Sequence, residues 1–257
     1  MAEASIQTGE RQTVRGCWAA SLGDCEGKIS REHLVSESLL PEGGIMVSGL
    51  PWCKDEPKPI GNAAFTGKIL CRKHNTELSE LDYSVKQSFD TLSEAWRLYD
   101  ARSKIITRRW TPKTFTVDGS LLERWFLKTL INLSHGGQWI IGEGSHTTGM
   151  PNDELVRITF GRAAFREKAG LYIASYDGEQ EVRVYPGLSL TPKTIGNNLM
   201  AGMFAFGGLY FFLSLVHEDL REHQGARLRY HMTQFQYGTH DDKRRRVKSH
   251  RVDITWQ

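Results

Sequence analysis

ILCRKHNTELSELD, residues Ile69 to Asp82, sets Cys71 and His74 three residues apart, directly before a helical pattern of leucines. Two side chains at this spacing come from one tight turn and can reach a single zinc ion. The apolar residues that follow recur every three or four positions, which predicts one buried face on a helix from about Asn75 to Asp100. The stretch therefore predicts a metal-binding turn that leads into a packed helix.

A second pair of cysteines, Cys17 and Cys25, lies upstream in a segment rich in Gly, Pro and Ser. Together with Cys71 and His74 they would form a closed Cys3His site, and such a site can fold a segment that has little apolar core. The gap of seven residues between the first two cysteines is wider than usual, so Cys53 is an alternative ligand in place of either. Each cysteine taken singly is better explained as a small buried hydrophobe. The set of four predicts a structural Zn2+ site.

The bulk composition is that of an ordinary globular protein with one or two domains. The chain has 257 residues, 39% of them hydrophobic and 25% charged, and its net charge of +3 is too small to imply a polyanionic partner by itself. The first fifteen residues are polar and lack an apolar stretch of the kind that signal peptides carry. We therefore expect a cytoplasmic location, where disulfides are disfavoured and metal binding better explains the cysteines.

An uncharged run of eighteen residues, Leu199 to Val216, is just long enough for a membrane helix. Three glycines interrupt it, aromatic residues dominate it, and no lysine or arginine lies close to either end. We interpret it as two buried strands joined at Gly207 and Gly208, and expect no membrane partner.

The remaining patterns favour an α+β fold over a doubly wound sheet, because helices and strands do not alternate regularly. Ser120 and Glu123 form a capping-box pattern ahead of a second helix, and DELVRITFGRAAF predicts a third helical piece. Strand-like runs are TRRWTPKTFTV, LYIASY, EVRVYP, FAFGGLYFF, ARLRYHM and HRVDITW. We expect a flexible leader over residues 1–16, a zinc-containing domain with the long helix over 17–100, and a mixed helix and antiparallel-sheet domain over 101–257.

Between the two ligand pairs lies Ile29-Ser-Arg-Glu-His33. A cysteine pair, then Arg-Glu-His, then Leu-Cys-x-x-His-Asn at the head of a helix resembles a divergent branch of the HNH, or ββα-metal, nuclease family. The resemblance covers about residues 17–82, a quarter of the chain. It implies a small zinc-stapled ββα-metal unit, and a role in prokaryotic or phage defence or in a mobile element.

The resemblance also implies catalytic roles for individual residues. His33 matches the general base that activates water, while Glu32 and Asn75 match ligands of a catalytic divalent ion, Mg2+ or Mn2+. Histidine has a pKa suited to taking a proton from water near pH 7, and Mg2+ prefers carboxylate and amide oxygens. The implied reaction is hydrolysis of phosphodiester bonds in nucleic acid, with DNA a better candidate than RNA.

One position departs from the family pattern. Many members carry a central asparagine about five residues before the cysteine of the metal turn, where this chain has Thr66. Asn62, nine residues before Cys71, is the residue that we expect to brace the base from a longer loop. The alternative to a nuclease is therefore a catalytically inactive, zinc-stabilised module that binds nucleic acid or protein.

A basic tract near the end of the chain, KRRRVKSHR at residues 243–251, can neutralise phosphates. An equally good explanation is a solvated loop before a last strand. The residues that we expect to contact nucleic acid are Arg31, Lys73, Lys243, Arg244, Arg245 and Arg246. Residues 101–257 would then select the substrate or bind a protein partner or a second copy of the chain.

Overall fold

The computed structural model describes residues 12–39, 45–51, 53, 56–61, 65–104, 111–166, 168–176, 188–216, 222–223, 226–237 and 250–257. It has a mixed α+β fold with more strands than helices, as the sequence predicts. The strands and helices are β1 (Ile29–His33), β2 (Ile45–Val47), β3 (Lys58–Ile60), β4 (Thr66–Cys71), α1 (Arg72–Ser103), β5 (Thr114–Asp118), α2 (Gly119–Gly137), β6 (Ile140–Ile141), α3 (Asp153–Thr159), β7 (Gly170–Tyr176), β8 (Ser189–Ile195), β9 (Asn198–Phe206), β10 (Leu209–Ser214), β11 (Glu222–His223), β12 (Ala226–Tyr230), β13 (Gln234–Tyr237) and β14 (His250–Thr255). Two short 3-10 helices are η1 (Ala20–Leu22) and η2 (Glu37–Leu39).

The long helix α1 forms where the leucine pattern predicts it, with wider bounds. Its N-cap is Cys71, so Asn75 lies within the first turns and does not cap the helix. The predicted apolar face is buried as far as Leu92, and Trp96 packs against the core with part of its surface exposed. The helix therefore carries the metal turn at one end and a core-facing stripe along its length.

The cap of α2 differs from the predicted capping box. Asp118 is the N-cap, and its side chain accepts a hydrogen bond from the backbone N–H of Leu121. Glu123 is drawn away from the helix start because it accepts from the backbone N–H of Leu171 and pairs with His231. A tertiary contact has thus taken the glutamate that a local capping box would use.

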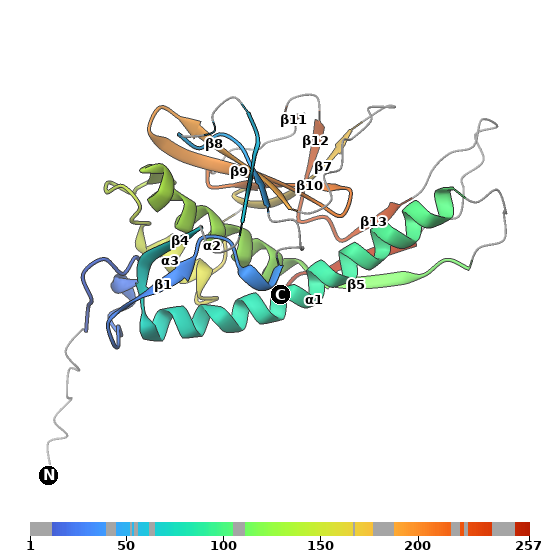
Figure 1. Cartoon of the computed structure of the whole chain (residues 1–257). Helices are drawn as coiled ribbons and strands as arrows, with labels where there is room; N and C mark the ends of the chain where they lie inside the picture. Colours follow the sequence, from blue (N-terminus) through green and yellow to red (C-terminus); the bar gives the residue numbers. More distant parts are fainter. Residues whose placement is uncertain are drawn as a thin grey trace, which may run out of the picture.

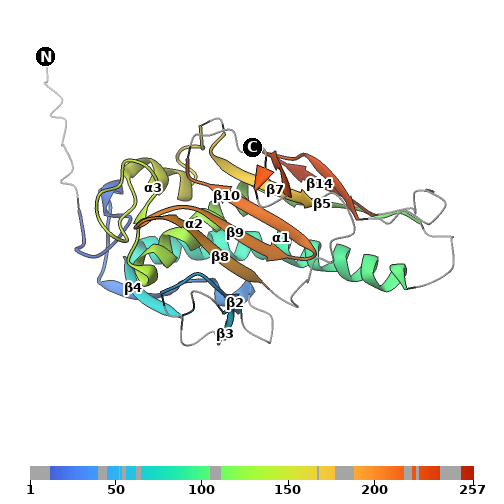
Figure 2. The same cartoon turned by 90° about the horizontal axis from the view of Figure 1, so that it is seen from above.

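The largest sheet has nine strands in the order β11-β12-β7-β10-β9-β8-β2-β3, with β6 paired to β9. It lies across α2 and α1, as Figures 1 and 2 show from two directions. The ring of Phe126 on α2 lies 4.2 Å from that of Phe204 on β9 and 5.3 Å from that of Phe211 on β10. Helix and sheet therefore share one aromatic core.

The apolar run 199–216 forms the two strands that its glycines predict. β9 and β10 pair as an antiparallel hairpin, and Gly207 and Gly208 occupy the turn with positive φ values of 56° and 72°. Two left-handed residues in a row suit the tight turn of a hairpin. Within the described residues, no helix is long and apolar enough to cross a membrane.

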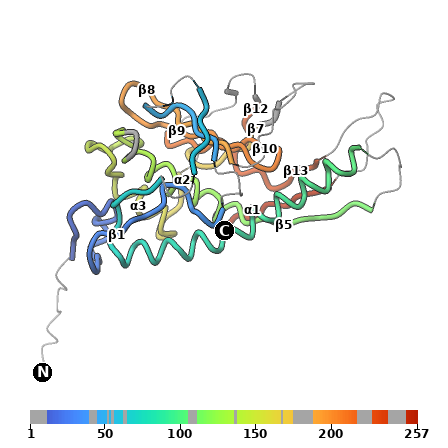
Figure 3. Tube along the Cα trace, viewed as in Figure 1, coloured from blue at the N-terminus to red at the C-terminus, as the bar shows by residue number. Residues whose placement is uncertain are grey.

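Strands from both ends of the chain share sheets with strands distant in sequence. β2 pairs in parallel with β8, so an early strand lies beside the late ones in Figure 2. β14 pairs in parallel with β5, and both lie alongside the far half of α1 in Figure 3. The predicted sheet was antiparallel, and these pairs, with β6 and β9, are parallel exceptions.

One hydrophobic core includes residues on both sides of position 100, and the predicted division into domains stays a prediction.

Some predicted features lie outside the described residues. These are residues 1–11 of the leader, residues 107–110 of the TRRWTPKTFTV run, the strand-like EVRVYP run at 181–186 and residues 243–249 of the basic tract. Gln12, at the described end of the leader, exchanges backbone hydrogen bonds with Gly23 and Cys25.

Candidate metal centre

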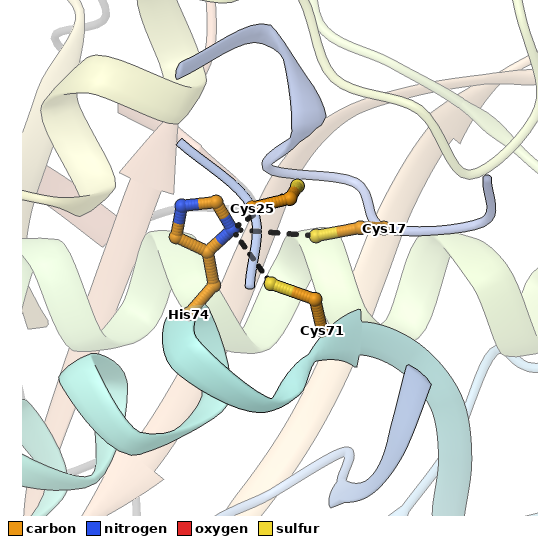
Figure 4. Close-up of side chains that lie close together, drawn as sticks. All are labelled: Cys17, Cys25, Cys71 and His74. Atoms are coloured by element: carbon orange, nitrogen blue, oxygen red, sulfur yellow. Dashed lines mark hydrogen bonds between the residues drawn. The ribbon is translucent and has the colours of Figure 1, made fainter. Parts of the chain in front are cut away.

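Cys17, Cys25, Cys71 and His74 lie together at the N-terminal start of α1, as Figure 4 shows. All four are buried, and their candidate ligand atoms lie within 4.8 Å of one another. His74 Nδ1 is 3.4 Å from Cys17 Sγ, 3.7 Å from Cys25 Sγ and 3.2 Å from Cys71 Sγ. The four residues could therefore hold one metal ion.

The donor set and its spacing fit zinc. For a tetrahedral ion with Zn–S near 2.3 Å and Zn–N near 2.0 Å, neighbouring ligand atoms lie about 3.6 to 3.8 Å apart. The observed N–S distances fall close to that range. Three thiols and one imidazole are also the ligand types that zinc prefers.

The wide spacing of the first cysteine pair has a local explanation. After Cys17 the chain forms η1 and then turns back at Gly23, which has a φ of 77°. The backbone N–H of Cys25 then donates to the carbonyl of Gln12. The seven intervening residues thus form a compact loop, and Cys53, although buried, lies outside the cluster.

Burial perturbs two of the thiols. Burial raises the pKa of the Cys17 thiol to about 12, and burial raises the pKa of the Cys25 thiol as well. Thiols in such a site ionise when a divalent cation supplies the compensating charge, because a coordinating thiol is deprotonated. The cluster is thus suited to a metal and unsuited to free thiolates.

Asp24 supports the histidine from outside the cluster. Its Oδ1 accepts a hydrogen bond of 2.9 Å from His74 Nε2, which leaves Nδ1 facing the three sulfurs. Burial alone would raise the pKa of Asp24, but hydrogen bonds from Lys73 and His74 outweigh it and lower this pKa to about 2. A carboxylate of this kind fixes the ring and raises the basicity of a ligating histidine. No sequence pattern singles out Asp24 beyond its place beside Cys25.

Residues after position 100 cover the cluster. The ring of Phe160 lies edge-on to the ring of His74, with 5.3 Å between the two ring centres. The centre of the Phe160 ring also lies 5.8 Å from that of Trp18. Trp18 Nε1 donates to Asn132 Oδ1 on α2, and Arg162 Nη2 lies 3.6 Å from Asp24 Oδ2. The candidate metal centre is therefore closed to solvent by both halves of the chain, as structural zinc sites are.

The predicted general base, His33, ends β1. It pairs in register with Thr66 on β4, and its Nε2 lies 3.6 Å from Glu37 Oε2. The His33 side chain is 36% exposed, so it remains accessible. Its backbone carbonyl accepts a hydrogen bond from Asn132 Nδ2, which fixes the end of the strand.

Asn75 is held against β1. Its Nδ2 donates to Ser30 Oγ at 2.9 Å and to the Arg31 carbonyl at 3.1 Å. In the part of the chain that the structure describes, Asn75 Oδ1 accepts no hydrogen bond, so an oxygen stays available to a ligand. Asn75 thus ties the start of α1 to the strand that ends in His33.

Glu32, a predicted ligand of the catalytic ion, has a cation as its partner. Its Oε1 lies 2.7 Å from Lys128 Nζ, and Lys128 Nζ also lies 2.7 Å from Asp82 Oδ2 on α1. Burial raises the pKa of Glu32, while Lys128 opposes the shift. Sequence reasoning missed this buried network, although Lys128 is a lone charge in the apolar run WFLKTLINL.

The other predicted contact residues divide into two groups. Arg31 is exposed on β1, and Lys73 is paired with Asp24 at 3.0 Å and Glu26 at 3.6 Å. Asn62, Lys243, Arg244, Arg245 and Arg246 lie outside the described residues. Their roles, and the catalytic roles of Glu32, His33 and Asn75, stay predictions.

Comparison of the chain with protein-family models, with curated proteins and with solved structures finds no match in any of the three.

Proposed function

We propose that the chain is a metal-dependent, HNH-like endonuclease that hydrolyses phosphodiester bonds, with DNA as the preferred substrate. The observation that carries the proposal is the Cys3His cluster at the junction of β4 and α1. β1 and β4 form a two-stranded antiparallel sheet, and α1 follows directly. The order strand, strand, helix with a metal at the junction is what the resemblance to ββα-metal nucleases implies.

In this proposal His33 accepts the proton of the attacking water. The end of β1 is fixed by pairing with β4 and by the hydrogen bond from Asn132, so the imidazole has a defined place at the surface. A histidine that exchanges its proton near neutral pH suits general base catalysis. The exposed fraction of 36% leaves room for a large substrate to approach.

Asn75 and Glu32 would hold the catalytic ion. Asn75 donates through Nδ2 to the strand, which leaves Oδ1 as a hard oxygen ligand. Glu32 uses Oε1 for Lys128, and Oε2 takes part in no ion pair within the described residues. A bound Mg2+ or Mn2+ would stabilise negative charge on the phosphate and on the leaving oxygen. Lys128 would hold Glu32 in one rotamer.

A binding module without catalysis is the second candidate, and two observations favour it. Thr66, whose side chain has no amide, occupies the register position opposite His33. The Lys128 ammonium already compensates the charge of Glu32, which weakens that carboxylate as a ligand. In this case the zinc-stapled unit would present Arg31 and its neighbours to nucleic acid or protein without cutting.

Nicking of supercoiled plasmid DNA separates the two candidates. Zinc-loaded protein is incubated with added Mg2+ or Mn2+, and a parallel reaction contains excess chelator. The proposal expects cutting that requires the added ion and is lost in His33→Ala and Asn75→Ala. His146→Ala is the matched control, because His146 is also exposed and lies outside the candidate site.

Each outcome of that experiment supports a different conclusion. Equal zinc content in wild type and His33→Ala shows that the variant has kept its scaffold. Equal cutting by His33→Ala and wild type, or no cutting of plasmid, single-stranded DNA or RNA, rejects the nuclease. Retention of DNA on a filter without any cutting would support the binding module.

A further inference from the structure

A cavity of about 650 Å3 lies at the C-terminal end of α2. Its walls come from the residues that end α2, the turn between β8 and β9, and the segment after β2. Trp139, Pro51 and Pro192 form apolar walls, while Lys193, Gln138 and Asn197 supply polar groups. This volume is within the range of small-molecule sites, and the cavity is separate from the metal centre and from His33.

The charge of this cavity is one-sided. Among the described lining residues Lys193 alone is charged, and no described carboxylate lies in ion-pair distance of Lys193 Nζ. Burial lowers the pKa of Lys193, so its surroundings disfavour the ammonium. An anion close to Nζ would reverse that effect, because an opposite charge favours the protonated amine.

Two local distortions place side chains at the cavity. Gln138 follows α2 in the left-handed region, with a φ of 57°, at a position where helices usually carry glycine. The pairing of β8 with β9 shifts register between Lys193 and Thr194. Strained backbone and bulges of this kind recur where a fold aims side chains at a ligand. Both distortions meet at this cavity, whose described lining residues carry no negative charge.

We propose that this cavity binds the phosphate group of a nucleotide-sized ligand. Lys193 supplies the positive charge, and the side-chain amides of Gln138 and Asn197 donate hydrogen bonds. Trp139 and Pro51 provide the apolar contact that a nucleoside offers and that free phosphate lacks. The proposal goes beyond the endonuclease and does not depend on it, because none of these residues belongs to the metal centre or touches His33.

Calorimetric titration of the full-length, zinc-loaded protein tests this proposal with three probes: adenosine 5′-monophosphate, adenosine and inorganic phosphate. The nucleotide should bind more tightly than either of the other two, since it alone fills both the charged and the apolar parts. Lys193→Met should weaken nucleotide binding by about tenfold or more, which is the loss expected for a hydrogen bond to a charged group. Lys86→Met removes an exposed lysine on α1 and should leave nucleotide binding unchanged.

Gln138→Gly separates a binding role from a structural one. Glycine relieves the left-handed strain, so the variant should unfold at the same temperature as wild type or a higher one. Its affinity for the nucleotide should nevertheless fall several-fold, because a donor is lost. His33→Ala should bind the nucleotide as wild type does, which keeps this site distinct from the proposed nuclease centre.

Three results would overturn the proposal. One is nucleotide affinity that Lys193→Met leaves unchanged. Another is equal affinity for the nucleotide and for adenosine, since the phosphate would then contribute nothing. The third is absence of nucleotide binding at a ligand concentration of about 1 mM, where even weak specific sites fill substantially.

Discussion

Lys128 Nζ lies 2.7 Å from Glu32 Oε1, so a cation on α2 fixes the residue directly before His33 in β1. The same ammonium holds Asp82 on α1 at 2.7 Å, and the Lys128 side chain is only 2% exposed. Three elements thus meet at one buried charge. Part of the chain beyond residue 100 is therefore built into the support of the candidate site.

Lys128→Met tests how much this network contributes to the free energy of unfolding. Removal of the ammonium leaves two carboxylates close together with no cation, and loss of one partner of a buried ion pair costs about 3–5 kcal/mol. Urea unfolding should show a loss of that order. Lys86→Met, which breaks an exposed pair with Asp90, should cost no more than about 0.5 kcal/mol.

A rescue variant makes the same test independent of packing. Addition of Glu32→Gln and Asp82→Asn to Lys128→Met removes the uncompensated charges, and much of the lost stability should return. If Lys128→Met alone costs as little as Lys86→Met, the buried ion pair does not support the fold as inferred.

The metal centre predicts one zinc ion per chain. Cys71→Ser should lose this zinc and several kcal/mol of stability, because binding free energy at a structural site contributes directly to folding. Cys53→Ser is the matched control, since Cys53 is equally buried and lies outside the cluster. Elemental analysis and thermal unfolding measure the two effects. Zinc retained by Cys71→Ser, or lost by Cys53→Ser, would mean that the ligand set is different.

Asp24 should tune the affinity of that site. Asp24→Asn keeps the shape but removes the charge that holds the His74 ring, and changes of this type cost about 10- to 100-fold in metal affinity. Competition with a chromogenic chelator measures the ratio. Glu26→Gln changes a neighbouring exposed carboxylate that pairs with Lys73, and the zinc affinity of this variant should match wild type.

His250 predicts a pH dependence of stability. Its side chain is buried, and burial with the positive charge of Arg102 lowers its pKa below the ordinary value. The unfolded chain therefore binds more protons between that lowered pKa and about 6.5, and stability declines as pH falls through this window. His250→Gln should show a weaker decline below about pH 6.5 in urea unfolding. Parallel curves for the two proteins would exclude His250 as the source.

The close approach of α2 to β9 at Gly202 leaves no room for a side chain at this position. A Cβ placed there would lie 2.5 Å from Leu130 Cδ2, so Gly202→Ala should destabilise the protein by about 1–3 kcal/mol. Gly61→Ala is the control, because a Cβ there meets nothing within 4 Å. Denaturant midpoints compare the two. An equal effect of both changes would show that α2 can shift away from the sheet.

Features with a short sequence range could be predicted from sequence. The leucine repeat located α1, the glycine pair located the turn between β9 and β10, and the Cys-x-x-His spacing located the metal turn. In each case the side chains concerned lie within one helix face, one hairpin or one turn. Cys17 and Cys25 could be assigned to the same cluster because few other residues of the upstream segment have side chains that ligate zinc.

Features that depend on distant partners could not be predicted. No local sequence pattern marks Glu32 as part of a buried ion pair. Its partner Lys128 comes beside it only through the packing of α2. Glu123 fits a capping box until Leu171 and His231 take its carboxylate. Both glutamates are polar residues whose neighbours are set by tertiary packing, and no local pattern records those neighbours.

The parallel pairing of β14 with β5 has a consequence for synthesis on the ribosome. The ring of Tyr237, in the strand beside β14, covers Trp96 and Tyr99 near the end of α1. A nascent chain from which Cys17, Cys25, Cys71 and His74 have already emerged still exposes this aromatic end of the helix until Tyr237 and β14 have also emerged. The two ends of α1 are thus completed at different times during synthesis.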